Sequence, residues 1–240
     1  MNHDNDDLET VLYKIIEQLS SEDVPIVFKG ALALKDLLYM NNPDLEFNRR
    51  TTDIDANWCD EYNEDKIIDI IEIAVKKVNN KYSVELYRLP EDNVSMGINI
   101  LDENKIIVSK IDMDIKNNPF YIVCKINDTN IKYSNINKMM CDKLLSISGT
   151  HVFRRIKDIF DIYLIILNYQ IKKEDIDNIL KYESKQLGDF SVLLSNKELI
   201  KNGYVKLKNI DMKPDFEIIW IALIEFLEKE RFLDGNTIVN

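Results

Sequence analysis

The stretch RRTTDIDANW, residues 49–58, decides how this chain of 240 residues is interpreted. Asp53 and Asp55 flank a single isoleucine, Ile54, in a pattern that is typical of a β-strand. Residues two apart on a strand point to the same face and lie about 6.5–7 Å apart along the chain. The stretch therefore predicts two carboxylates on one side of a sheet, with Ile54 directed into the core.

A second strand with the same pattern is KIDMDI, residues 110–115, where Asp112 and Asp114 share a face. Carboxylates held close together repel one another unless a cation lies between them. Mg²⁺ suits such a place because it takes hard oxygen ligands and keeps positions for water and phosphate. One alternating strand alone is explained as well by a solvated face. Two such strands favour an acidic metal site to which the second strand supplies a third carboxylate.

The segment VFKGALAL, residues 27–34, predicts a strand that runs through Lys29 and Gly30 into a helix. Glycine lets a phosphate approach the backbone, and the first turn of a helix offers N–H groups without partners. Many α/β proteins have such a turn, so it is a weak signal alone. Because it precedes Asp53 by 23 residues, we expect it to hold a triphosphate beside the acidic strand.

The remaining pattern predicts an α+β chain with no repeat and no low-complexity linker. The expected helices of the first half are 7–20, 31–40 and 64–79, and the expected strands are 25–30, 51–58, 82–87, 94–101, 105–115 and 120–126. After about residue 130 the pattern is helical only, with candidates at 135–148, 154–168, 173–183 and 215–230. We expect the boundary between the two halves within residues 127–135.

Composition excludes several classes of protein. No run of about 18 apolar residues is present, so we expect no transmembrane helix and no membrane partner. The acidic start MNHDNDDLET is unlike a secretory signal. Cys59, Cys124 and Cys141 fit no metal or disulfide spacing, as expected of reduced thiols in the cytoplasm. The net charge of −11 argues against nonspecific DNA binding.

The charge is unevenly distributed along the chain. Residues 105–157 carry 10 basic and 4 acidic side chains, a net charge of +6. Such a segment can hold a polyanion. The alternative, which weighs equally, is that lysines scatter by chance through a lysine-rich chain.

KGALAL together with RRTTDID resembles the first motif of the DNA polymerase β-type nucleotidyltransferases. More narrowly it resembles the AbiEii/AbiGii toxin branch, where a strand-KGG-helix turn precedes an R-x-T-x-D-I-D strand. MMCDKLLSISGTHVFRRIKDIFDIYLI, residues 139–165, resembles the later signature of that branch. The resemblance covers about residues 24–168. Ala31 replaces the second glycine and Leu32 the usual threonine, which leaves phosphate binding to backbone N–H groups and Lys29.

This resemblance implies a mixed β-sheet of the nucleotidyltransferase type with flanking helices over residues 1–130, the catalytic domain. It implies a helical domain over residues 131–240 that closes the cleft. The implied reaction is Mg²⁺-dependent transfer of NMP from an NTP to an acceptor hydroxyl, with two metal ions at the attacking and leaving oxygens. Asp53, Asp55 and Asp112 would be the metal ligands, and Asp112 (less favoured, Asp114) would also accept the proton of the attacking group.

The resemblance also assigns the nucleotide contacts. The implied catalytic residues of the helical half are Lys143 and Asp158, and the implied nucleotide-binding residues are Lys29, Gly30, Ala31, Arg50, Asp114 and Asp161. The alternative for Lys143 is a surface lysine on an amphipathic helix. The alternative for Asp158 and Asp161, which are spaced i, i+3, is a pair of solvated ions with Arg154 and Lys157.

Three functions follow from these residues. The first is a toxin-like enzyme that modifies RNA, such as the 3′ end of tRNA, and is countered by a cognate antitoxin. The second is a transferase for a small molecule, such as an antibiotic hydroxyl, or for a protein. The acidic total charge suits a cationic aminoglycoside. The third is a degenerate, non-catalytic fold used as a binding module, which Ala31 and Leu32 leave open.

Overall fold

The computed structural model describes residues 3–21, 24–45, 49–88, 94–208, 210–211 and 213–233. It divides into two compact units. The first comprises Met1–Leu34 and Thr51–Asn135, and the second comprises Lys35–Arg50 and Ile136–Asn240. The predicted α+β class is confirmed, because the first unit holds a mixed sheet and the second is helical.

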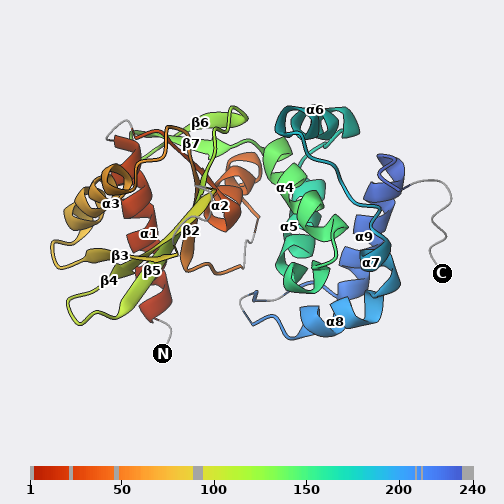
Figure 1. Cartoon of the computed structure of the whole chain (residues 1–240). Helices are drawn as coiled ribbons and strands as arrows, with labels where there is room; N and C mark the ends of the chain where they lie inside the picture. The colour runs from red at the N-terminus through yellow and green to blue at the C-terminus, as the bar shows by residue number, and fades with distance from the viewer. Residues whose placement is uncertain are drawn as a thin grey trace. The chain divides into compact units, whose positions relative to one another are not determined.

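The sheet of the first unit has the strand order β3-β4-β5-β2-β1-β7-β6 (Figure 1). Its strands are β1 (Ile26–Lys29), β2 (Asp53–Trp58), β3 (Ser83–Arg88), β4 (Ser95–Leu101), β5 (Ile107–Ile115), β6 (Tyr121–Ile126) and β7 (Thr129–Ser134). The central strand β2 runs parallel to β5 and antiparallel to β1. Most residues of β2 therefore pair with a strand on each side, which fixes the position of the β2 backbone.

Two helices of the first unit, α1 (His3–Ser21) and α3 (Glu64–Val78), pack against each other and contact the sheet at β7 and β3 (Figure 1). Helix α3 begins at an N-cap, Asn63, whose side chain accepts a hydrogen bond from the Lys66 N–H at 3.0 Å. Its apolar face buries Ile67 and Ile71 completely. The hydrophobic core of this unit therefore lies on the helix-covered face of the sheet.

The prediction that only helices follow residue 130 is wrong for β7. This strand pairs with β6 through a two-residue turn at Asn127 and Asp128, which have φ angles of 46° and 66°. Two positive φ angles are the geometry of a type I′ hairpin, which Asn and Asp tolerate. Ile131 and Tyr133 are fully buried. Their alternation was concealed because polar residues fill the rest of residues 127–135.

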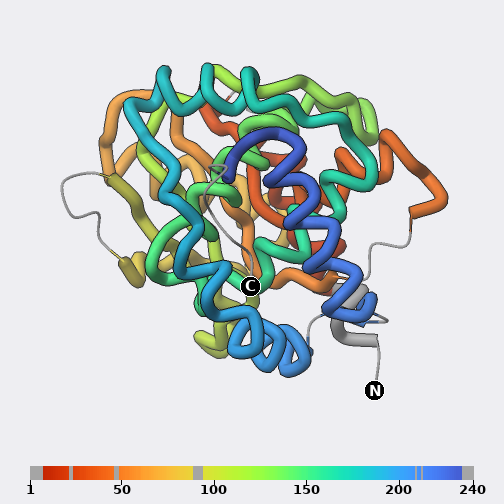
Figure 2. Tube along the Cα trace, turned by 90° about the vertical axis from the view of Figure 1, so that its right-hand side faces the viewer, coloured from red at the N-terminus to blue at the C-terminus, as the bar shows by residue number. Residues whose placement is uncertain are grey.

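The second unit contains six helices within the described residues, traced from green to blue in Figure 2. They are α4 (Ile136–Ser148), α5 (Ile156–Asn168), α6 (Lys173–Glu183), α7 (Ser191–Ser195), α8 (Lys197–Val205) and α9 (Phe216–Lys229), with a 3₁₀ turn at Val152–Arg154. Helix α2 (Gly30–Asn41) begins in the first unit, and its C-terminal half belongs to the second. Helix α5 packs against α4 and α9. No helix in the described ranges is long and apolar enough to cross a membrane.

Candidate active site

Four carboxylates share one face of the sheet in the first unit. Asp55 on β2 lies in register with Asp112 on β5 and with Lys29 on β1, while Asn57 lies in register with Asp114. Paired residues of neighbouring strands point to the same face. Asp53, two residues before Asp55, therefore belongs to this set as well. We call Asp53, Asp55, Asp112 and Asp114 the acidic face.

The opposite face of the same strands is apolar. Ile54 is 1% exposed, and Ile111 and Met113 are completely buried. The predicted strands and their alternation are confirmed at these positions. The apolar side chains anchor both strands in the core, and so they fix where the acidic face points.

The turn between β1 and α2 touches the acidic face directly. Gly30 has a φ of +73°, and a Cβ built there would lie 2.0 Å from the Asp55 Oδ2. Helix α2 begins at Gly30 and has no acidic residue in its first turn. Its first N–H groups lack helical partners and attract anions. Because the side chains of Ala31 and Leu32 are buried, only their backbone N–H groups are offered to a ligand.

Lys29 lies on the acidic face and compensates part of its charge. Its Nζ donates to the Asp114 Oδ2 at 2.5 Å, with the two side chains 20% and 47% exposed. The Thr52 hydroxyl donates a hydrogen bond to the Asp53 Oδ1 at 3.1 Å. An anion that binds at the β1–α2 turn would therefore compete with Asp114 for Lys29.

Asp112 is held from the edge of the sheet by two residues that sequence reasoning missed. Its Oδ1 accepts hydrogen bonds from the Tyr87 hydroxyl at 2.6 Å and from the Arg88 Nη2 at 2.7 Å. Burial, followed by the hydrogen bond to Asp112, raises the pKa of Tyr87 to about 12. The Tyr87 hydroxyl therefore keeps its proton at neutral pH and donates it to the carboxylate. No motif marked either residue.

The acidic face suits a divalent cation in chemistry and in register, but its side chains do not converge. Among the described residues, no group of three or more His, Cys, Asp or Glu side chains gathers closely enough to hold a metal ion. Asp112 is directed to Tyr87 and Arg88 instead. Carboxylates on adjacent strands nevertheless supply the hard oxygen donors that Mg²⁺ prefers.

The second unit holds a buried cluster of four charges, which we call the ion cluster: Arg49, Lys143, Asp158 and Asp161. The Lys143 Nζ lies 2.5 Å from the Asp161 Oδ2 and 3.1 Å from the Asp158 Oδ1. Arg49 forms a salt bridge with the same oxygen of Asp161. The Asp161 side chain is completely buried, and that of Lys143 is 10% exposed. The alternatives of a surface lysine and of solvated ion pairs are therefore wrong for Lys143 and Asp161.

The ion cluster keeps Asp161 and Lys143 charged. Burial by itself would raise the pKa of Asp161, but the charges of Arg49 and Lys143 outweigh it and hold this pKa below its ordinary value. Burial would likewise lower the pKa of Lys143, but Asp161 and Asp158 outweigh it and raise this pKa. The Lys143 ammonium is thus fixed as a cation next to Asp158.

From the sequence, a site role was assigned to Arg50 and none to the preceding residue, Arg49. Arg50 is half exposed and pairs with Asp211 at 2.7 Å, whereas Arg49 enters the ion cluster and forms an isolated backbone bridge with Ile210. The signal was in the sequence, because the first arginine of R-x-T-x-D-I-D is Arg49 itself. The role expected of Arg50 stays a prediction.

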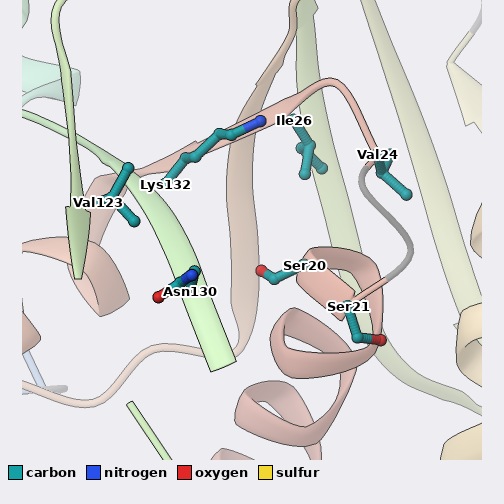
Figure 3. Close-up of a pocket in the computed structure, with 7 residues that line it drawn as sticks. All are labelled: Ser20, Ser21, Val24, Ile26, Val123, Asn130 and Lys132. Atoms are coloured by element: carbon teal, nitrogen blue, oxygen red, sulfur yellow. The ribbon is translucent and has the colours of Figure 1, made fainter. Parts of the chain in front are cut away.

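A cavity of about 340 Å³ lies elsewhere in the first unit (Figure 3). Its lining comes from the end of α1, from β1 with the segment before it, and from β6 and β7: Ser20, Ser21, Val24, Ile26, Val123, Asn130 and Lys132. No residue of the acidic face or of the β1–α2 turn contributes to it. The cavity therefore does not define the candidate active site.

Comparison with known proteins confirms the resemblance found in the sequence. Residues 11–232 match the family model described as Nucleotidyl transferase AbiEii toxin, Type IV TA system. No curated protein matches the sequence. The fold is shared with JHP933 from Helicobacter pylori at a TM-score of 0.60 and 15% identity, covering 97% of this chain and 94% of that one. A candidate nucleotidyltransferase from H. pylori gives a TM-score of 0.60 at 17% identity, covering 98% of this chain and 100% of that one.

Proposed function

This chain belongs to the AbiEii nucleotidyl transferase toxin family, and we propose on that premise that it transfers NMP from an NTP to an acceptor hydroxyl. One observation carries the proposal. Asp55 on the central strand lies in register with Asp112 on one side and against Gly30 of the β1–α2 turn on the other, and Asp53 shares its face. Carboxylates and a helix N-terminus are thus adjacent, as binding of a triphosphate with its cation requires.

The chain's own residues divide the work of binding. The backbone N–H groups at Gly30, Ala31 and Leu32 would donate hydrogen bonds to the phosphate oxygens, since Gly30 has no side chain and those of Ala31 and Leu32 are buried. Lys29 would add a positive charge at the same place. Asp112 would take the proton of the attacking hydroxyl. The catalytic roles implied for Lys143 and Asp158 of the second unit stay part of the proposal, and these two side chains pair with each other at 3.1 Å.

Asp53, Asp55 and Asp112 would hold Mg²⁺. When bound, the cation supplies neutralisation of the charge that develops on the phosphoryl, attacking and leaving oxygens. Asp112 would have to share the oxygen that Tyr87 and Arg88 now occupy, or offer its other one.

The proposed acceptor is RNA, in particular the 3′ end of tRNA, and the proposed location is the cytoplasm. The net charge of +6 over residues 105–157 supports a polyanionic acceptor in an otherwise acidic chain. The family is described as part of a Type IV toxin–antitoxin system, which supports a cognate antitoxin as partner. The overall charge of −11 favours one second candidate, a cationic small molecule that carries a hydroxyl.

The test is nucleotide labelling with matched aspartate variants. Wild type, Asp53→Asn, Asp55→Asn and Asp69→Asn would each be incubated with Mg²⁺, one α-labelled NTP at a time, and total cellular RNA. Asp69 is an exposed carboxylate on α3, so its variant controls for the loss of one charge. We expect label in the tRNA band with wild type and Asp69→Asn. We expect about a 10³-fold loss in the two β2 variants, because metal binding supplies several kcal/mol of transition-state stabilisation.

Other results of the labelling assay would favour one of the alternative functions. Label on an aminoglycoside and none on RNA would replace the RNA acceptor by the small molecule. No label on any acceptor, together with no rise in melting temperature on addition of NTP and Mg²⁺, would favour the non-catalytic binding module and refute the proposed transfer.

A further inference from the structure

Tyr87 reaches across one strand to touch the acidic face. It lies on β3 at the edge of the sheet, and β4 separates β3 from β5, which carries Asp112. Gly97 on β4 lies in register with Asp112. A Cβ at Gly97 would lie 2.4 Å from the Tyr87 Cζ and 2.8 Å from its hydroxyl oxygen. The absence of a side chain at Gly97 is therefore what lets the Tyr87 ring lie over β4.

The Tyr87 hydroxyl is held in place at the carboxylate. It donates to the Asp112 Oδ1 at 2.6 Å, while the residue as a whole is 40% exposed. The Lys110 Nζ lies 4.9 Å from the centre of its ring, and the Arg88 guanidinium lies 5.7 Å away. The hydroxyl of a partly exposed tyrosine is thus fixed on the carboxylate, and two cationic side chains lie near its ring.

We propose that Tyr87 is itself a nucleotide acceptor, so that the chain nucleotidylates its own Tyr87. This inference rests on the proposed function, in which Asp112 takes the proton of the attacking hydroxyl. The Tyr87 hydroxyl makes the contact that an acceptor hydroxyl would make with that carboxylate.

The step balances with NTP as the only co-reactant. The Tyr87 Oη attacks the α-phosphorus, and an Oη–P bond forms. The bond from the α-phosphorus to the oxygen that bridges to the β-phosphate breaks, and pyrophosphate leaves. The phenolic proton passes to Asp112. The product is a phosphodiester between Tyr87 and the nucleoside, which would cover Asp112 and limit further transfer.

Intact-protein mass spectrometry of the purified full chain tests this proposal. The chain would be incubated with Mg²⁺ and each of the four NTPs in turn, without RNA, and the modified peptide would be sequenced. Tyr87→Phe removes the acceptor oxygen. Tyr121→Phe is the matched control, because Tyr121 is 42% exposed on β6 of the same sheet. Gly97→Ala would displace the Tyr87 ring, although both the Tyr87 hydroxyl and the Asp112 carboxylate are still present in this variant.

We expect one added nucleotidyl group on wild type and on Tyr121→Phe, located at Tyr87, and none on Tyr87→Phe. Gly97→Ala should slow the modification at least about tenfold, since loss of a positioned geometry costs this much or more. The rate per molecule should not change on dilution, because the reaction is intramolecular. Melting curves would establish that each variant is folded. If Tyr87→Phe does not fold, the rate of modification in Gly97→Ala tests whether Tyr87 is the acceptor.

The proposal is overturned if wild type labels RNA or a small acceptor but gains no mass, or if the added group lies on another residue. It is overturned equally if Tyr87→Phe is modified as fast as wild type. Failure of the proposed function looks different, because wild type then labels neither an external acceptor nor itself.

Discussion

Replacing Asp161 by alanine is expected to destabilise the helical unit by about 3–5 kcal/mol, the cost of removing one partner from a buried ion pair. Asp161 is completely buried and receives both Arg49 and Lys143 on one oxygen. Without it, Lys143 keeps only Asp158, and Arg49 loses its carboxylate inside the unit. The measurement is urea unfolding at pH 7, with hydrogen exchange of α4 and α5 to assign the loss to this unit.

The matched control is Asp177→Ala on α6. Asp177 forms an i, i+4 pair with Lys173 at 2.6 Å, and both side chains are 40% exposed or more. Screened pairs of this kind contribute about 0.2–1 kcal/mol. Equal and small losses for Asp161→Ala and Asp177→Ala would contradict the view that the ion cluster supports the unit.

The destabilisation should also depend on pH in a definite direction. Because the folded pKa of Asp161 is lowered, its stabilising contribution is present above the unfolded value of about 3.9 and is lost as the pH falls through the folded pKa. Because the folded pKa of Lys143 is raised, its stabilising contribution is fully present at pH values below the ordinary lysine pKa. This contribution is lost as the pH rises through the folded pKa. The difference between wild type and Asp161→Ala should therefore stay constant from about pH 5 to pH 9 and shrink below about pH 4.

The sequence predicted those parts of the site that follow from local periodicity. Alternation alone placed Asp53 and Asp55 on one face and Ile54 in the core, because a strand has a period of two whatever surrounds it. The same alternation placed Asp112 and Asp114 together on a second strand. These features are local and need no knowledge of the tertiary structure, whereas the pairing of β2 with β5 is shown by the structure.

The residues that were missed act across the fold. Tyr87 reaches Asp112 only because Gly97 lies on the strand between them, and sequence spacing does not reveal which strands are neighbours. Arg49 and Asp161 are separated by more than a hundred residues, and their pairing depends on how the second unit folds. Burial of Lys143 is likewise a tertiary property, since it depends on how α4 packs against α5.

Replacing Gly30 by alanine is expected to lower the stability of the first unit by about 2 kcal/mol or more and to reduce nucleotide transfer about 10²-fold. The left-handed φ of +73° costs a residue with a Cβ about 1–2 kcal/mol. The added methyl group would also lie 2.0 Å from the Asp55 Oδ2 and 2.7 Å from the Asp55 Cγ. Since β2 is held by neighbours on both sides, the strain must displace the Asp55 carboxylate or the β1–α2 turn.

A displacement of about 1 Å at a catalytic group can cost about 10²-fold in rate, which is why the effect on transfer should exceed the effect on folding. Thermal unfolding and the nucleotide labelling assay measure the two effects separately. Gly149→Ala is the control, because its nearest neighbour, the Leu145 carbonyl oxygen, lies 3.9 Å from the added Cβ, and we expect a change within about 0.5 kcal/mol. If Gly30→Ala folded and transferred nucleotide like Gly149→Ala, close approach of the β1–α2 turn to Asp55 would not be required for the reaction.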